Sequence, residues 1–193
     1  MIRPVSQADL DALYEICLRT GDAGEDATHL YSDPRLLGEI YVGPYVVLDS
    51  GLGFTVEVDG RLGGYVLGTP DTRRFEDECE ERWWPRLRRR YPDPPSVPDE
   101  HLVAIIHHPP RVPDEVAIRF PAHLHIDLLP QCQGRGLGRQ LIDHILTEFE
   151  ASGAGGVHLG VDRRNRRAIG FYERLGFEPL SETGDGVCFV LEL

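Results

Sequence analysis

The sequence contains no lysine, so all 20 of its basic residues are arginine. Every motif that needs a lysine is therefore excluded, including the phosphate-binding loop GxxxxGK[ST]. The sequence also has no run of 18 apolar residues, so no transmembrane helix and no membrane partner are expected. Its first residues, MIRPVSQADLDALYEICL, lack an apolar stretch followed by a small-residue cleavage site, so no signal peptide is expected.

Paired cysteines and excess positive charge are also missing. The four cysteines form no CxxC pair, which favours free thiols and a cytoplasmic location. The net charge of −12 argues against a nucleic-acid partner, which binds best to a basic face. The same charge is compatible with a cationic or amine substrate. A length of 193 residues with 41% hydrophobic and 27% charged residues is typical of one soluble domain.

The N-terminal third contains two helical patterns and one hairpin pattern. Residues 6–20 begin with a serine N-cap signal and carry an apolar stripe at helical spacing. A second short helix is predicted over residues 35–42. Residues 54–67 alternate between apolar and polar side chains around an Asp-Gly turn signal, which predicts a β-hairpin.

The segment 71–121 combines a highly charged stretch with a dense proline cluster. Its last 30 residues hold eight of the chain's 15 prolines. Residues 71–91 are predicted to be partly helical, and Pro85 is expected to break or kink the helix. We interpret the segment as an insertion or lid beside an active site, within a single domain of residues 1–193. A stiff surface loop is the alternative.

The last third is the most regular part of the sequence. Strands are predicted over residues 122–129 and 157–161, and helices over 137–151 and 166–175, followed by two short strands. Alternating strands and helices predict an α/β (α+β) domain.

A glycine-rich stretch, QCQGRGLGRQLI at residues 131–142, separates the first of these strands from its helix. Glycines ahead of a helix let several backbone N–H groups point at an anion, and the helix dipole adds positive charge there. The stretch therefore predicts a phosphate site. A dinucleotide fingerprint GxGxxG fits poorly, since Gly134 and Gly136 are followed by Arg139 at the third position. A structural glycine turn remains an alternative.

The spacing Gln131-x-x-Gly134-x-Gly136 resembles the pyrophosphate-binding signature Q/R-x-x-G-x-G/A of the GCN5-related N-acetyltransferase (GNAT) superfamily. The stretches HLHIDLLP and VHLGVD resemble the family's fourth and fifth strands, and NRRAIGFYERLGF its next helix and strand. Within the superfamily the chain is most similar to bacterial relatives of the acetyltransferase-like C-terminal domain of O-GlcNAcase. The resemblance implies a GNAT fold, with a mixed central sheet splayed between strands 4 and 5 and flanked by helices.

The resemblance also implies acetyl-CoA as co-substrate and no metal. The backbone N–H groups of residues 134–138 would hold the pyrophosphate, and the pantetheine arm would pair with the exposed backbone of the fourth strand. The predicted cofactor contacts are Leu128, Leu129, Gln133, Gly134, Arg135, Gly136, Leu137, Gly138, Arg139, Asn165, Ala168, Phe171 and Tyr172.

Acetyl transfer to an amine needs a neutral amine, a polarised thioester carbonyl and a leaving thiolate. Asp127 is the candidate general base, because its strand position matches a common base position of the family. His125 lies on the same strand face and could orient Asp127 or relay a proton. Tyr172 is the candidate general acid, and the backbone N–H of Leu129 or a neighbour the candidate carbonyl donor. Asp127 could instead fix a loop, and Tyr172 could be a core aromatic residue.

Other readings of these residues stay open. H-x-H-x-D on one strand face could be a metal site, although no companion ligand has a convincing spacing. Asp162 could cap the following helix or face the acceptor. The arginine cluster of Arg163, Arg164, Arg166 and Arg167 could form a solvated loop near the adenine side of CoA or its 3′-phosphate. Trp83 and Trp84 could shape an acceptor pocket, form a homodimer contact or anchor the insertion. The acceptor could be a small amine, an amino sugar or a protein amine. A binding module or pseudoenzyme without turnover is the alternative function.

Overall fold

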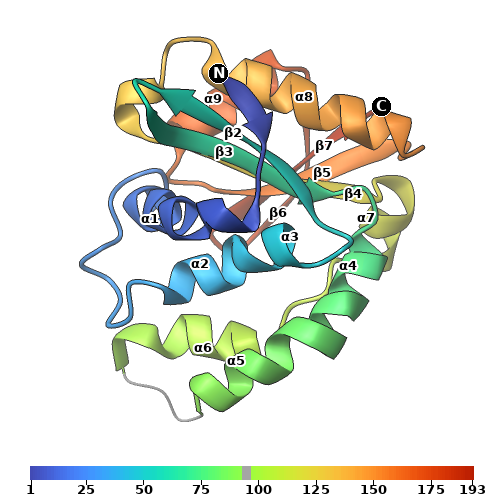
Figure 1. The fold of residues 1–193 in the computed structure, drawn as a ribbon. Helices are drawn as coiled ribbons and strands as arrows, with labels where there is room; N and C mark the ends of the chain where they lie inside the picture. The colour runs from blue at the N-terminus through green and yellow to red at the C-terminus, as the bar shows by residue number, and fades with distance from the viewer. Residues whose placement is uncertain (93–96) are drawn as a thin grey trace.

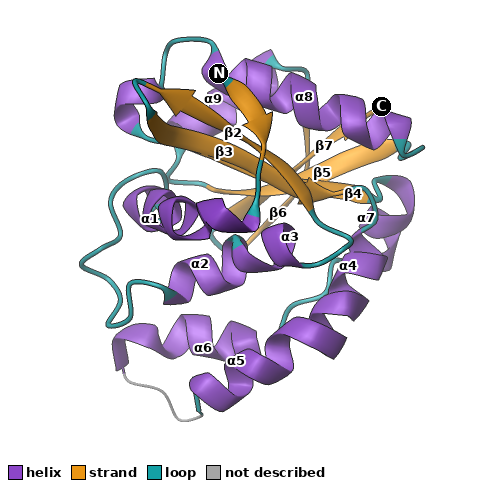
Figure 2. Cartoon of the chain, viewed as in Figure 1, coloured by secondary structure: helices purple, strands orange, loops and turns teal. Residues whose placement is uncertain are grey.

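The protein is described here by a computed structural model covering residues 1–92 and 97–193. Its centre is a seven-stranded sheet in the order β1-β2-β3-β4-β5-β7-β6, with helices packed on both faces (Figures 1 and 2). The strands are β1 Ile2–Pro4, β2 Leu52–Val58, β3 Arg61–Thr69, β4 Ala122–Leu128, β5 Gly156–Asp162, β6 Glu178–Thr183 and β7 Gly186–Glu192. The helices are α1 Leu10–Thr20, α2 Leu36–Tyr41, α3 Gly43–Val47, α4 Thr72–Glu78, α5 Trp84–Arg90, α6 Glu100–His107, α7 Asp114–Arg119, α8 Leu137–Ala151 and α9 Arg166–Arg174.

The sheet is splayed between β4 and β5. Neighbouring strands pair antiparallel except β4 and β5, which are parallel. Their register has only two pairs, Ala122 with Val157 and His123 with His158. Beyond those pairs no described strand lies beside the backbone of β4 on this side, which leaves its N–H groups there for another partner. The predicted mixed, splayed sheet is therefore confirmed.

Each face of the sheet has its own apolar layer. On one face α8 packs on the sheet, with Leu124 of β4 among its buried neighbours. On the other face α1, α2 and α3 pack against β3 through residues that include Tyr65. Because side chains alternate along a strand, Asp127 points to the second face and pairs in register with Tyr65. The prediction that the leucine face of β4 meets the core is confirmed.

The predicted helix over residues 6–20 forms with an irregular start. A 3₁₀ turn, Gln7–Asp9, precedes α1, and Ser6 and Asp9 form a capping box. The helix predicted over residues 35–42 is confirmed as α2, and a further short helix, α3, begins at Gly43 with Pro44 in its first turn. The hairpin is confirmed, since its turn residues Asp59 and Gly60 both have positive φ.

The segment 71–121 is more helical than its prolines suggest. A π-helical turn, Cys79–Trp83, joins α4 to α5. Pro85 lies in the first turn of α5, where the missing N–H of proline costs little stability. The regular α-helix is interrupted just before Pro85, as predicted. The proline-rich part contains α6 and α7, and α6 buries Leu102, Val103 and Ile106 in the core. The stiff-loop alternative is therefore wrong for α6, while residues 93–96 lie outside the described residues.

Within the described residues, no helix is long and apolar enough to cross a membrane.

Candidate active site

The glycine-rich loop after β4 presents a row of free backbone amides. Gly134 has a φ of 70° and Gly136 a φ of 76°, a left-handed conformation that glycine adopts without strain. Gly136 is the N-cap of α8, whose first-turn N–H groups have no acceptor inside the helix. Among the described residues, no backbone or side-chain acceptor takes a hydrogen bond from the amides of residues 134–138. The loop therefore has the geometry that suits an anion.

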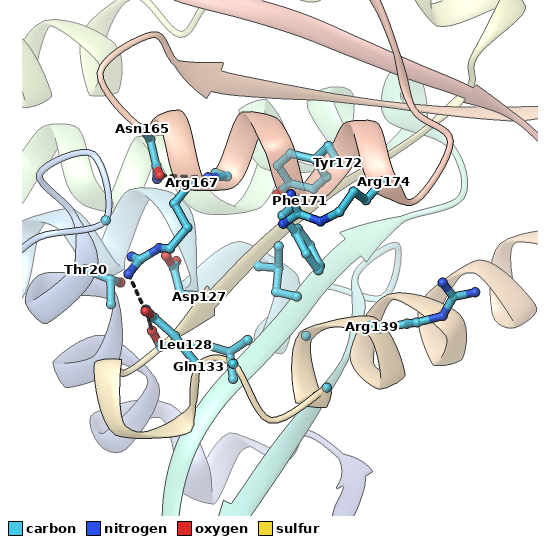
Figure 3. A pocket seen from close by; sticks show the side chains of 16 residues that line it. Thr20, Asp127, Leu128, Gln133, Arg139, Asn165, Arg167, Phe171, Tyr172 and Arg174 are labelled. Carbon is cyan, nitrogen blue, oxygen red and sulfur yellow. Dashed lines mark hydrogen bonds between the residues drawn. The ribbon is translucent and has the colours of Figure 1, made fainter.

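A cavity of about 490 Å³, the first cavity, extends from this loop along β4 to α9. Figure 3 shows Arg167 reaching across it to Gln133, with Thr20 and Asp127 close by. The first cavity is lined by Thr20, Gly24, Ile126, Asp127, Leu128, Gln133, Gly134, Gly136, Gly138, Arg139, Asn165, Arg167, Ala168, Phe171, Tyr172 and Arg174. Three arginines on the wall of an acidic protein favour a negatively charged ligand.

Gly138 brings α8 close to the neighbouring apolar side chains. A Cβ atom placed on it would lie 3.1 Å from Leu128 Cδ1 and 3.3 Å from Phe171 Cζ. A larger residue would therefore narrow the first cavity between β4 and α9, so glycine keeps that passage open.

Asp127 stands in the first cavity as a partly buried carboxylate. The Tyr65 hydroxyl donates a hydrogen bond of 2.6 Å to its Oδ2 atom. Burial raises the pKa of Asp127 above its usual value, and the hydrogen bond from Tyr65 opposes that rise. A carboxylate with a raised pKa inside a cavity is a better proton acceptor than one in water, which is what a general base requires.

Replacing Tyr65 with phenylalanine tests this pairing. Loss of this hydrogen bond removes the larger of two contacts that favour the charged carboxylate, the other being Thr20, so the pKa of Asp127 rises further. We expect the acidic limb of the kcat/KM pH profile for acetyl transfer to move to higher pH. Tyr14→Phe is the matched control, because the buried Tyr14 hydroxyl donates to Glu39 in a different part of the core. An unshifted limb in Tyr65→Phe, or an equal shift in the control, would contradict the pairing.

Tyr172 lines the first cavity from α9 and is only 6% exposed. Its ring contacts Phe171, Phe177 and Phe189. Burial, together with the negative charge of Asp127, raises the pKa of the phenol, so Tyr172 keeps its proton at neutral pH. It is therefore both a core aromatic residue and a protonated group on the cavity wall.

His125 does not line the first cavity. Its Nε2 atom lies 3.0 Å from the Tyr45 hydroxyl, and its ring belongs to a second cavity on the same face of the sheet. No hydrogen bond between His125 and Asp127 is present in the described part of the chain. A relay from His125 to Asp127 therefore stays a prediction without a contact to carry it.

Leu129 as the predicted carbonyl donor needs a correction, whereas its alternative, a neighbouring N–H, stays a prediction. The backbone N–H of Leu129 donates to the Gly63 carbonyl at 2.9 Å, so β3 already uses it. Alternate residues of an antiparallel strand bond to the partner, and the others face away. The N–H groups of Ile126 and Leu128 therefore face the gap towards β5. The Leu128 carbonyl faces the same way, and it accepts a hydrogen bond of 2.7 Å from Gln133 Nε2.

Asp162 also has a different role from the expected cap. Asn165 is the N-cap of α9, and its side chain accepts a hydrogen bond from the Ala168 N–H at 3.0 Å. Asp162 instead accepts from the backbone N–H of Arg164 and forms an ion pair with the same residue at 2.8 Å. Of the arginine cluster after β5, Arg167 is the member that lines the first cavity.

A family model described as the acetyltransferase (GNAT) family matches residues 12–177. The chain belongs to the GNAT acetyltransferase family. The solved structure of SsHAT has a TM-score of 0.91 and 40% sequence identity to this GNAT chain, covering all of it and 97% of SsHAT. The predicted family is therefore confirmed.

More distant relatives of the GNAT chain agree with this assignment. Protein O-GlcNAcase of Rattus norvegicus is 26% identical over 180 residues, which cover 91% of this chain. The chain spans about a fifth of the length of that relative, with 20% covered. The structure of the PaiA N-acetyltransferase from Thermoplasma acidophilum in complex with coenzyme A has a TM-score of 0.58 at 16% identity. It covers 100% of this chain and 98% of that one, and it shares the fold.

The structure brings most of the predicted site residues of this GNAT chain together and leaves four outside the lining of the first cavity. Those four are Leu129, Arg135, Leu137 and His125. Sequence reasoning missed Tyr65, Thr20, Gly24 and Arg174. Tyr65 reaches Asp127 through strand pairing. Thr20 ends α1 and Gly24 lies in the loop after it, both more than 100 residues before Asp127. Of these four residues only Gly24 carries a sequence signal, because a glycine indicates a turn. In the structure Gly24 has a φ of 93°.

Proposed function

We propose that the protein is an acetyl-CoA-dependent N-acetyltransferase that transfers acetyl directly from the CoA thioester to an amine. The observation that carries this proposal is the row of free amides at residues 134–138, which opens into a cavity containing Asp127. An anion site joined to an apolar channel and a buried carboxylate fits a coenzyme with a diphosphate, a long neutral arm and a reactive end.

Several side chains suit the bound coenzyme. The amides of residues 134–138 hold the pyrophosphate, and Arg139 and Arg174 add positive charge at the same wall. The unpaired edge of β4 offers the N–H groups of Ile126 and Leu128 to the amide-rich arm or to the thioester oxygen. Gln133 and Arg167 lie over this edge, so both move aside when the arm binds.

Acetyl-CoA supplies an acetyl group activated as a thioester. Asp127, directly or through a water molecule, accepts the proton that the amine loses as its nitrogen bonds to the acetyl carbon. Tyr172 donates its proton to the sulfur as the carbon–sulfur bond breaks, and solvent later reprotonates Tyr172 and takes the proton that Asp127 accepted. The products are an N-acetylated amine and free CoA, so atoms and charge balance.

Replacing Tyr172 with phenylalanine tests the acid. Because a thiolate leaves readily, we expect kcat to fall only about 10- to 100-fold, at the low end for acid catalysis. The ring and its contacts remain, so the melting temperature and the KM for acetyl-CoA should change little. A kcat equal to that of the wild type would show that Tyr172 is a core residue alone.

Two measurements test the proposed function. Calorimetric titration with acetyl-CoA should show one site per chain, and a thiol-release assay over a panel of amines should show turnover with at least one of them. Binding without turnover on any amine would favour an acetyl-CoA-binding module. No binding of acetyl-CoA at tens of micromolar would contradict the proposal. We further propose that the segment 71–121 is an insertion that helps to enclose the acceptor amine, and that the protein acts in the cytoplasm.

A further inference from the structure

A second cavity of about 770 Å³ lies on the α1–α3 side of the sheet, between the helices α4, α5 and α6 and the strands β4 and β5. Its walls are mostly aromatic and aliphatic. Tyr41 and Tyr45 come from α2 and α3, Phe75 from α4 and Trp84 from α5. This volume is within the usual range for a site that encloses a small molecule.

The charged residues on this wall are already neutralised. Glu80 forms an ion pair with Arg88 at 2.6 Å. Glu76 pairs with Arg73 at 2.6 Å and with Arg111 at 3.3 Å. Both carboxylates that line the second cavity are thus engaged by arginine, so the cavity offers little to a ligand with several cationic groups. It suits a largely apolar molecule.

A chain of hydrogen bonds fixes the protons of two histidines in the second cavity. The Thr72 hydroxyl lies 2.7 Å from the Pro121 carbonyl, which has no proton, so Thr72 donates to it. His123 Nδ1 lies 2.8 Å from the same hydroxyl and must therefore be the N–H donor. In a neutral imidazole the other nitrogen is then an acceptor, so the Tyr45 hydroxyl donates to His123 Nε2 at 2.7 Å.

The chain ends at His125. Because the Tyr45 proton is used on His123, His125 Nε2 must donate to the Tyr45 oxygen at 3.0 Å. His125 Nδ1 is then a bare lone pair, and among the described residues nothing donates a hydrogen bond to it. Burial lowers the pKa of His125 to about 4 and that of His123 well below its usual value, so both rings are neutral at physiological pH.

The second cavity adjoins the first along β4. His125 lines the second cavity and Asp127, two residues further along the same face of the strand, lines the first, a step of about 6–7 Å. Leu159 and Gly160 of β5, just past the point where the two strands separate, also line the second cavity. A molecule in the second cavity therefore reaches the same gap in the sheet as the end of a molecule in the first.

We propose that the second cavity binds the acceptor, a primary amine carried on an aromatic or similarly flat apolar body, and that His125 Nδ1 accepts a hydrogen bond from its amine. This inference rests on the proposed function, since it assigns the acceptor of the same reaction. The aromatic walls bury the apolar body, and the fixed lone pair orients the amine without a negative charge that would hold it as an unreactive ammonium.

Binding is tested without turnover. 2-Phenylethylamine is titrated into the protein saturated with free CoA, and tryptophan emission is followed with excitation at 295 nm, where the amine is silent. Trp84 lines the second cavity, whereas Trp83 is buried and its indole N–H donates to the Glu39 carbonyl at 2.8 Å. We expect a saturable change that Trp84→Phe removes, and none with spermidine. No saturable change with 2-phenylethylamine, or an equal response to spermidine, would overturn the proposal.

Two substitutions distinguish the role of His125 Nδ1 from that of Nε2. In His125→Asn the side-chain oxygen can take the place of Nδ1 and keep the acceptor, whereas in His125→Gln the amide takes the place of Nε2 and keeps only the Tyr45 contact. For 2-phenylethylamine we expect His125→Gln to weaken binding about 10- to 100-fold, the cost of one lost polar partner, and His125→Asn to weaken it about threefold. Acetyl-CoA affinity should be unchanged in both. Equal losses in the two variants would contradict the assignment.

The outcomes also separate this inference from the proposed function. Saturable amine binding without thiol release would support an amine site in the second cavity and contradict the proposed acetyltransferase activity. Thiol release with spermidine or an amino sugar, but not with 2-phenylethylamine, would support the enzyme while overturning this acceptor class.

Discussion

Asp127→Asn is expected to lower kcat for acetyl transfer by about 10²- to 10⁴-fold and to leave the affinity for acetyl-CoA nearly unchanged. Asparagine keeps the size of the side chain and can still accept the hydrogen bond from Tyr65, but it cannot take a proton from the amine. The measurement is the thiol-release rate at saturating acetyl-CoA, together with a calorimetric Kd for the coenzyme.

Asp162→Asn is the matched control, because it removes the same charge from an aspartate that ends the neighbouring strand. That carboxylate is held by Arg164 outside the first cavity, so we expect a change in kcat of less than about threefold. An equal loss of coenzyme affinity and kcat in Asp127→Asn would show that Asp127 supports the loop rather than the chemistry.

The same substitution has a predictable effect on stability. The pKa of Asp127 is higher in the folded protein than in the unfolded chain, so its contribution to stability is fully present below the unfolded pKa near 4. That contribution is lost as the pH rises through the raised folded pKa, and at neutral pH the charged carboxylate destabilises the fold. Asp127→Asn should therefore match or exceed the wild-type melting temperature at pH 7. A clear fall at pH 7 would mean that the charge is stabilising.

Gly138→Val is expected to weaken acetyl-CoA binding about 10- to 100-fold. Its Cβ would lie 3.1 Å from Leu128 Cδ1 and 3.3 Å from Phe171 Cζ, and the two methyl groups would extend into the passage between β4 and α9. A coenzyme arm forced past these methyl groups overpacks the passage in the bound state at a cost of about 1–3 kcal/mol, and 1.4 kcal/mol corresponds to a factor of ten in affinity. Calorimetric titration gives the Kd directly.

Stability separates a blocked passage from a damaged fold in this variant. Valine has a higher helix propensity than glycine, which offsets the local crowding in α8, so we expect a melting temperature within a few degrees of the wild type. Gly155→Val is the matched control, because a Cβ there has no neighbour within 4 Å. Full affinity in Gly138→Val would show that the coenzyme does not pass between Leu128 and Phe171.

The last third of the fold was predictable because its signals are local. The apolar stripe and the preceding glycines predicted a helix over residues 137–151, and α8 has these same bounds. The predicted strand over 157–161 lies within β5, and the helix over 166–175 overlaps all of α9. Each of these elements is defined by its own periodicity and by a glycine or asparagine at its start.

The partners of the candidate site were not predictable in the same way. Tyr65 meets Asp127 only through the register of β3 with β4, and no pattern within either strand gives that register. Tyr45, Trp84 and His158 share the second cavity although they are far apart in the sequence. The Nδ1 atom of His125 carries no proton because a chain of hydrogen bonds through Tyr45, His123 and Thr72 places the proton on Nε2. The sequence therefore supplies the histidine but not its role.

A crystal structure of the protein with acetyl-CoA would show directly whether the loop amides hold the coenzyme. We expect pyrophosphate oxygens within hydrogen-bond distance of the amides of residues 134–138, the arm beside the free edge of β4, and the thioester between Asp127 and Tyr172. Gln133 and Arg167 should have moved away from that edge. A coenzyme bound elsewhere, with the loop amides facing only solvent, would contradict it.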